Sequence, residues 1–81
     1  MSKLYDPPPQ VDVQLDLQGL PTALYWRGAL YQGKSLDHWR VQTEWWEQEV
    51  ARDYYLWSSN ELICVIYRDA QQQWHLQRIY D

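Results

Sequence analysis

The chain contains few of the residues that commonly stabilise or define small proteins. Of its 81 residues, one is Cys, three are Gly, four are Pro and none is Phe. The single cysteine, Cys64, cannot form an intramolecular disulfide, and the repeated cysteine spacing of a zinc site is missing. The low Gly and Pro counts exclude collagen-like and low-complexity chains. A domain of this length buries only about 60% of its unfolded surface, so it needs another source of stability.

Positive charge and long apolar runs are also scarce. Seven Lys and Arg stand against 11 Asp and Glu, which gives a net charge of −4. This balance lacks the basic footprint of nucleic-acid-binding proteins. No apolar run approaches the ~20 residues of a membrane-spanning helix, and residues 1–7 carry no apolar signal-peptide core. Together with the lone thiol, these features predict a cytoplasmic protein that does not enter a membrane.

Large aromatic side chains are what the chain has in excess. Six Trp and seven Tyr make it 16% aromatic, and 46% of the residues are hydrophobic. This composition excludes a disordered chain. Each Trp or Tyr buries roughly 150–250 Å², so the aromatic residues are the expected means of stabilising an undersized core.

The alternation of apolar and polar residues predicts an all-β fold. Residues 11–17 alternate without a fault, which is typical of a half-buried strand. Further strands are expected over residues 22–26, 29–32, 35–46, 51–57, 62–67 and 74–80. Turn signals recur between them, and Gly28 is free to adopt a positive φ in a tight turn with Arg27. We therefore predict a curled meander or barrel of about six to seven short antiparallel strands.

Two interruptions of this pattern set the expected boundaries. Pro7–Pro9 favour an extended polyproline conformation, so residues 1–10 are expected to form a tail and residues 11–81 the single domain. The tail acts either as a spacer or as a ligand for a partner's groove. Gly33 and Lys34 are expected to mark a break or a bulge after the third strand.

Adjacent aromatic residues constrain where the excess rings can lie. The three pairs are Tyr25–Trp26, Trp45–Trp46 and Tyr54–Tyr55. Neighbours in a strand point to opposite faces, so at least one member of each pair lies outside the main core. Two outcomes remain open at this point. The remaining rings form a second small core under the tail or under residues 47–50, or they form an exposed patch that binds a partner.

The sequence thus predicts an interaction surface. Its aromatic members are expected to be Trp26, Trp46 and Tyr55, with Arg27, Arg40 and Arg52 as polar anchors. Trp, Tyr and Arg are the residues most enriched at binding hot spots. The acidic net charge favours a protein partner over nucleic acid, with a homodimer as a competitor. A small barrel that binds single-stranded nucleic acid by base stacking is the alternative.

Catalytic and metal-binding signals are weak by comparison. His38 and His75 are the only histidines, and both are expected to be strand residues, with His75 facing outward between the inward Trp74 and Leu76. Cys64 lies in an apolar run, where a cysteine usually behaves as a small buried hydrophobe. No serine elbow, phosphate loop or metalloprotease helix is present. We therefore predict a non-enzymatic protein without catalytic, cofactor or metal residues, and keep an enzyme or small-ligand binder as a further alternative.

Several local strings together resemble a known family. They are Tyr25-Trp26-Arg27-Gly28, Tyr31, Trp39-Arg40, Trp45-Trp46, Arg52-Asp53-Tyr54-Tyr55, Tyr67-Arg68-Asp69, Trp74-His75-Leu76 and Tyr80-Asp81. In this order and spacing, residues 11–81 resemble DUF6504, a family of small bacterial proteins. Its members stand alone or form the C-terminal domain of ImuB-like Y-family translesion polymerase proteins. The resemblance implies a role in DNA damage tolerance or translesion synthesis, with a Y-family polymerase-like protein as partner.

Overall fold

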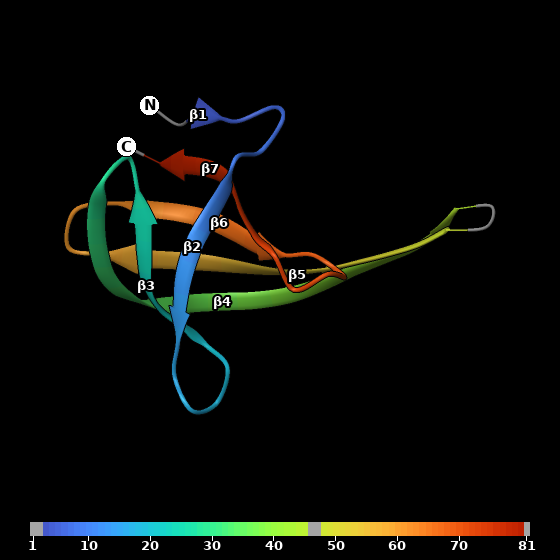
Figure 1. Cartoon of the computed structure of the whole chain (residues 1–81), viewed down its shortest axis with the longest axis horizontal. Helices are drawn as coiled ribbons and strands as arrows, with labels where there is room; N and C mark the ends of the chain where they lie inside the picture. Colours follow the sequence, from blue (N-terminus) through green and yellow to red (C-terminus); the bar gives the residue numbers. More distant parts are fainter. Residues whose placement is uncertain (1–2, 46–47, 81) are drawn as a thin grey trace.

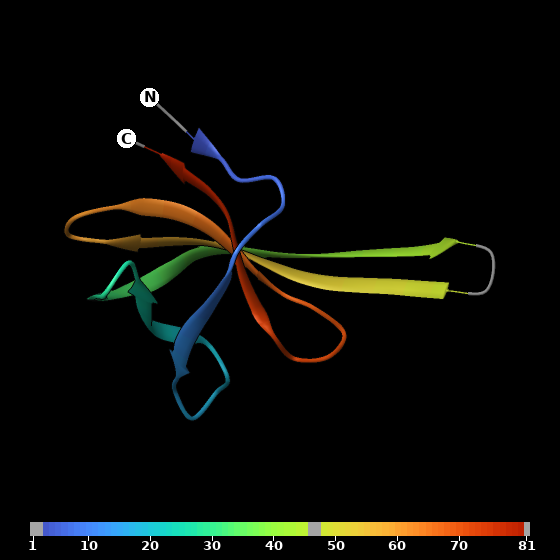
Figure 2. The same cartoon turned by 45° about the horizontal axis from the view of Figure 1, so that its top comes forward.

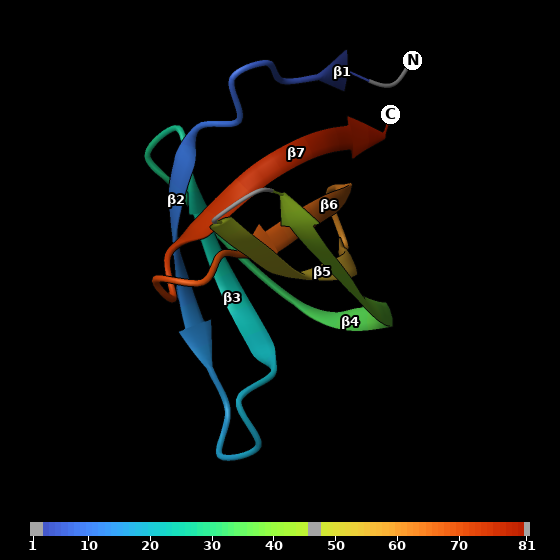
Figure 3. The same ribbon diagram turned by 90° about the vertical axis from the view of Figure 1, so that its right-hand side faces the viewer.

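In the computed structural model, which describes residues 3–45 and 48–80, seven β-strands follow one another along the chain and no helix occurs within these ranges. The strands are β1 (Lys3–Leu4), β2 (Gln10–Leu15), β3 (Pro21–Trp26), β4 (Ala29–Trp45), β5 (Gln48–Ser59), β6 (Ile63–Arg68) and β7 (Trp74–Tyr80). Consecutive strands from β2 to β7 pair antiparallel, and β2 also pairs with β7 (Figures 1 and 3). The result is a closed six-stranded barrel, with β1 added along β7. The predicted all-β small barrel is confirmed.

Strand β4 joins the two halves of the barrel. It pairs with β3 over residues 29–32 and with β5 from Gly33 onward. The hairpin of β4 and β5 continues beyond the barrel, as Figures 1 and 2 show. The predicted break at Gly33 and Lys34 is wrong, because the strand runs through both residues. Glycine is needed there for a different reason: a Cβ at position 33 would collide with the backbone carbonyl of Ser58. The bulge comes later, between Ser35 and Asp37.

The tight turn predicted between β3 and β4 is confirmed. Arg27 and Gly28 both have positive φ, at 51° and 78°, which matches the twist of a two-residue hairpin. Trp26 pairs with Ala29 on either side of it. The Arg27 guanidinium lies 5.2 Å from the Trp26 ring centre, so the turn side chain folds back onto the strand.

The β2–β3 and β6–β7 turns share one design based on an aspartate. In each turn, the side-chain Oδ1 of Asp16 or Asp69 accepts hydrogen bonds from the backbone N–H groups two and four residues ahead, at 2.8–2.9 Å. One residue in each turn has a positive φ, Gly19 in the first and Gln72 in the second. These side-chain bonds replace the ladder bonds that end at the strand termini.

The main core fills the inside of the barrel. It consists of Val11, Leu24, Tyr55, Trp57, Cys64, Ile66, Trp74 and Leu76. Trp57 is fully buried, and its indole N–H donates to the Pro21 carbonyl at 3.0 Å. This bond satisfies the one polar atom of the side chain and links β5 to the start of β3. The inward orientation predicted for Trp74 and Leu76 is confirmed.

Residues 3–9 are attached to the barrel along β7 (Figure 3). The Tyr5 N–H donates to the Gln77 carbonyl at 2.9 Å, and the Leu76 N–H donates to the Pro9 carbonyl at 3.0 Å. The Tyr5 ring meets the Trp26 ring edge-on, with centroids 5.4 Å apart. The described part of the predicted tail therefore covers one side of the main core.

Candidate functional site

A row of aromatic rings crosses the outer face of the sheet from β4 to β7. The register places Trp39 opposite Tyr54, Tyr54 opposite Tyr67, and Tyr67 opposite His75. Ring centroids along the row are 5.7, 5.1 and 4.9 Å apart, and the Trp39 and Tyr54 planes are parallel within 3°. Such pairs contribute roughly 0.5–1.5 kcal/mol each beyond their buried area. We call these four residues the aromatic row.

The two central rings of the aromatic row are buried although they lie outside the barrel. Tyr54 is 8% and Tyr67 is 4% exposed. They pack with Val65 and Leu56 into a second hydrophobic cluster, which we call the outer cluster. The Arg52 guanidinium lies 4.8 Å from the Tyr67 ring centre and donates to the Tyr54 hydroxyl at 3.4 Å. That hydrogen bond raises the pKa of Arg52, and burial raises the pKa of Tyr67.

Exposed apolar side chains border the outer cluster. They are Leu4, Trp39, Val41, Ile63 and Tyr80, and each is 38–56% exposed. The register places Ile63 opposite Tyr80, and β1 brings Leu4 beside Arg78. We call these five residues and the outer cluster together the outer apolar face. Contiguous apolar surface of this kind marks interaction sites on soluble proteins.

A hollow of about 500 Å³ opens on the outer apolar face. Leu56 and Val65 line it together with the exposed rings of Trp39 and Tyr80. One carboxylate, Asp37, and one guanidinium, Arg78, also line it. Mostly apolar walls with a few placed polar groups are the usual composition of a binding pocket.

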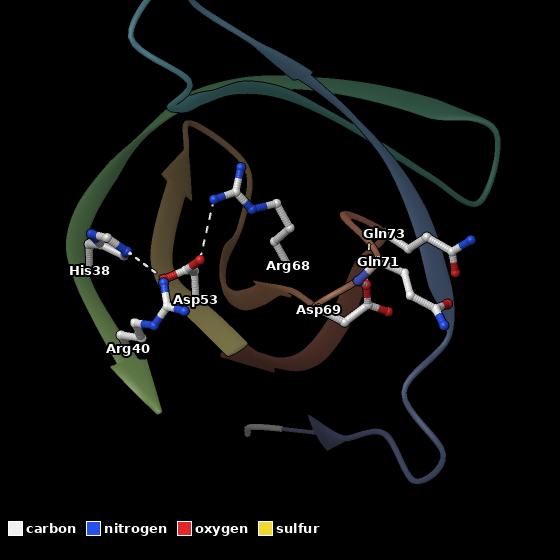
Figure 4. Close-up of polar contacts among 7 residues, drawn as sticks. All are labelled: His38, Arg40, Asp53, Arg68, Asp69, Gln71 and Gln73. Carbon is white, nitrogen blue, oxygen red and sulfur yellow. Dashed lines mark hydrogen bonds and ion pairs between the residues drawn. The ribbon is translucent and has the colours of Figure 1, made fainter. Parts of the chain in front are cut away.

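A charged cluster lies on the inner face where the β4–β5 hairpin leaves the barrel (Figure 4). The Asp53 carboxylate is 3.2 Å from the Arg68 guanidinium, 3.8 Å from that of Arg40 and 3.6 Å from His38 Nε2. The His38 ring also stacks on Tyr55 with centroids 4.4 Å apart and planes within 8°. Because one carboxylate is shared by two arginines, the cluster holds these side chains together and retains one excess positive charge.

His75 at the end of the aromatic row is held by the β6–β7 turn. Its Nε2 lies 2.9 Å from Asp69 Oδ2. Burial acts to raise the pKa of Asp69, but the backbone N–H groups of Gln73 and Gln71 and the His75 ring outweigh it, so the pKa is lowered overall. A carboxylate therefore orients His75 while it closes the turn.

The structure separates the predicted surface residues. Trp26 lies on the inner face, half-buried against the main core, and Arg27 stacks on it from the turn. Arg40 belongs to the inner charged cluster, whereas Arg52 covers the outer cluster. Trp46 lies outside the described residues. The predicted anchors thus occupy both faces of the barrel and do not line one groove.

The prediction that Tyr55 is exposed is wrong. Tyr55 is 3% exposed and belongs to the main core, while Tyr54 faces outward. The two rings do point to opposite faces, as the strand geometry requires. Both are buried because the outer face has its own hydrophobic cluster, with exposed apolar residues around it. A second core therefore exists, but it lies on the outer face of β5 and β6 and not under the tail, which covers the main core instead.

The sequence reasoning missed the aromatic row as a unit. Trp39, Tyr54, Tyr67 and His75 lie in four different strands. Each was placed in a strand correctly, but only the register brings them side by side. The available signal was the outward position expected for His75 beside the inward Trp74, which marks one end of the row.

The single cysteine, Cys64, lies buried in the main core. Burial raises the pKa of the Cys64 thiol to about 12, so the thiol stays protonated near neutral pH. Within residues 3–45 and 48–80, no three His, Cys, Asp or Glu side chains are grouped so that they could hold a metal ion. The same part of the chain contains no helix long and apolar enough to cross a membrane.

No protein-family model, no curated protein and no solved structure matches this chain.

Proposed function

We propose that this chain is a non-enzymatic, cytoplasmic protein-binding module whose partner binds the outer apolar face. The observation that carries the proposal is the position of Leu4, Trp39, Val41, Ile63 and Tyr80, which stay 38–56% exposed on one face around a buried cluster. Aromatic side chains are enriched at protein interfaces. Burying these side chains against a partner would remove a contiguous apolar surface from water.

The charges around this face favour protein over nucleic acid. Among the described residues, Lys34, Arg52 and Arg78 alternate with Asp37 and Asp69 on this face, so these cations do not form a continuous groove for a phosphate backbone. The central rings of the aromatic row are already covered by their neighbours and by Arg52, which leaves few free ring faces for bases. A protein partner needs neither a cationic groove nor free ring faces.

The proposed setting is DNA damage tolerance, with a Y-family polymerase-like protein as partner. This part of the proposal rests on the resemblance of residues 11–81 to DUF6504. It is tested with the purified Y-family polymerase-like protein of the same host. We expect binding that is lost in Trp39→Ala, and no binding at micromolar concentrations would contradict the proposed partner.

The binding face itself is tested by comparing variants in the host cell. Tagged wild-type and Trp39→Ala proteins are purified before and after DNA damage, and their bound proteins are identified. We expect the wild type to retain a partner that Trp39→Ala loses. Leu17→Ala is the matched control, because Leu17 is fully exposed in the β2–β3 turn and should keep the partner. Identical partner lists for wild type and Trp39→Ala would contradict the proposal.

Binding of single-stranded nucleic acid is the second candidate. The exposed Trp39 ring at the end of the aromatic row and the Arg52 guanidinium favour it, since base stacking contributes about 1–3 kcal/mol per base. Oligonucleotide affinity should then fall steeply with salt. A flat titration with labelled oligonucleotide at low salt would eliminate this candidate.

A further inference from the structure

The hollow on the outer apolar face follows one cross-strand row of the sheet. The register pairs Asp37 with Leu56, Leu56 with Val65, and Val65 with Arg78. All four side chains line the hollow. Its lining therefore changes in order from a carboxylate on β4, through two apolar side chains, to a guanidinium on β7.

Both charged ends of this row lack an opposite charge among the described residues. The Asp37 carboxylate accepts a hydrogen bond from the His38 N–H at 2.8 Å, and no described cation pairs with it. Within the described part of the chain, the Arg78 side chain makes no hydrogen bond or ion pair, and its guanidinium lies 5.7 Å from the Tyr80 ring centre. The two groups are thus available to charges brought by a ligand.

The length of the row determines how far apart the two charges of the ligand must lie. Asp37 and Arg78 are three strand spacings apart, which is roughly 14 Å. An extended chain advances about 3.3 Å per residue, so residues i and i+4 lie roughly 13 Å apart and point to the same side. Residue i+2 points to that side as well, halfway between them and above Leu56 and Val65.

We propose that the hollow binds an extended peptide segment with an acidic residue, an apolar residue and a basic residue at alternate positions. The acidic side chain pairs with Arg78, the basic side chain pairs with Asp37, and the apolar side chain enters between Trp39 and Tyr80. This inference rests on the proposed function and specifies the sequence of the bound partner segment.

A second copy of this chain does not supply such a segment. In the 81-residue sequence, only Arg40 and Glu44 carry opposite charges four residues apart, and Gln42 stands between them in place of an apolar residue. The free side of β4 is also poorly suited to strand addition, because the Asp37 carboxylate occupies the His38 N–H and a bulge precedes it. Charge complementarity therefore points to a different protein.

The experiment is a selection from a displayed library of random peptides. The targets are the whole wild-type chain, Arg78→Glu and the double variant Asp37→Lys/Arg78→Glu, each checked for unchanged circular dichroism and melting. We expect the wild type to enrich peptides with acidic, apolar and basic residues at alternate positions, in one chain direction. Arg78→Glu should bind these peptides about 3- to 10-fold more weakly, and the double variant should enrich the reversed charge order.

Each other outcome overturns the inference in a distinguishable way. The inference is overturned if the enriched peptides lack the charge pattern, or if they bind Arg78→Glu as tightly as the wild type. In that case Trp39→Ala can still show that the outer apolar face binds protein. If no peptide is enriched, the inference is overturned, and the partner lists of wild type and Trp39→Ala still decide the proposed function separately. Analytical ultracentrifugation tests whether a second copy covers the face. If the wild type is a dimer and Trp39→Ala is a monomer, the face binds a second copy, and the inference is overturned.

Discussion

Strands β5 and β6 carry hydrophobic side chains on both faces, and the two faces are buried in different ways. On the inner face, Trp57 and Ile66 are fully buried because the barrel closes around them. On the outer face, Tyr54 and Tyr67 are 8% and 4% exposed, and none of the described strands forms a second layer above them. Their cover comes from neighbouring rings and from the Arg52 guanidinium.

This difference suggests what each face contributes. The barrel interior is closed by contacts within the chain, and its core side chains are buried. The outer face is closed only at its centre, and apolar side chains remain exposed at its border. We therefore expect substitutions on the inner face to change stability, and substitutions at the border of the outer face to change binding.

The largest expected effect is on the inner face. Trp57→Ala should lower the free energy of unfolding by about 3–5 kcal/mol, because it removes the largest fully buried side chain and leaves the Pro21 carbonyl without its donor. Urea denaturation measures the loss. Trp57→Phe is the control that keeps most of the volume. A loss below about 1 kcal/mol for Trp57→Ala would mean that the barrel interior is not the main core.

The next effect concerns the border of the outer face. Trp39→Ala should weaken partner binding by about 2 kcal/mol, or roughly 30-fold, since exposed aromatics on an interface are frequent hot spots. The same substitution should cost about 1–2 kcal/mol of stability, less than Trp57→Ala, because Trp39 stacks on Tyr54 but is 39% exposed. Titration calorimetry and urea denaturation of the same variant give both values. A large loss of stability with unchanged binding would mean that Trp39 stabilises the fold and does not contact the partner.

A smaller effect is expected at the turn that holds His75. The pKa of Asp69 is lowered in the fold, so its carboxylate stabilises the protein fully above its ordinary pKa of about 4. This contribution is lost as the pH falls through the lowered value. Asp69→Asn should therefore cost about 1 kcal/mol at pH 7, and its deficit relative to wild type should shrink below pH 4.

Asp16 provides the matched control for this pH dependence. It closes the β2–β3 turn with the same backbone hydrogen bonds but without a histidine. Urea denaturation between pH 3 and 7 compares the Asn variants at both positions. An Asp69→Asn deficit that stays constant over this range would show that the charge of Asp69 does not stabilise the turn.

The smallest effect is expected at Cys64. The thiol is fully buried and its pKa is raised to about 12 by that burial. A thiol reagent at pH 8 should give no measurable labelling of the folded protein, and labelling should appear only with unfolding in urea. Rapid labelling of the native protein would show that the inner face opens to solvent, and the contrast between the two faces would fail.

Much of the fold follows from sequence patterns alone. The alternation in residues 11–17 and the adjacent aromatic pairs predict strands whose faces differ, and Gly28 predicts the tight turn. Gly33 misled the prediction because a glycine that permits close approach to Ser58 has the same sequence signal as one that breaks a strand. Only the partner strand distinguishes the two cases.

The candidate site was less accessible to prediction. Alternation indicates that Tyr54 and Tyr55 face opposite sides, but it does not indicate which side is the interior. That choice depends on the direction in which the sheet curls and on pairings such as Trp39 with Tyr54 and Val65 with Arg78. The aromatic row and the charged ends of the hollow exist only once residues from four strands are in register.

The central claim is that the border of the outer apolar face contacts a partner protein. Photo-crosslinking in the host cell tests it most directly, with a photoreactive amino acid placed at Trp39, at Ile63 or, as the exposed control, at Leu17. We expect one shared adduct of a second protein at positions 39 and 63 and none at position 17. An adduct at position 17 alone, or no adduct at 39 and 63, would contradict it.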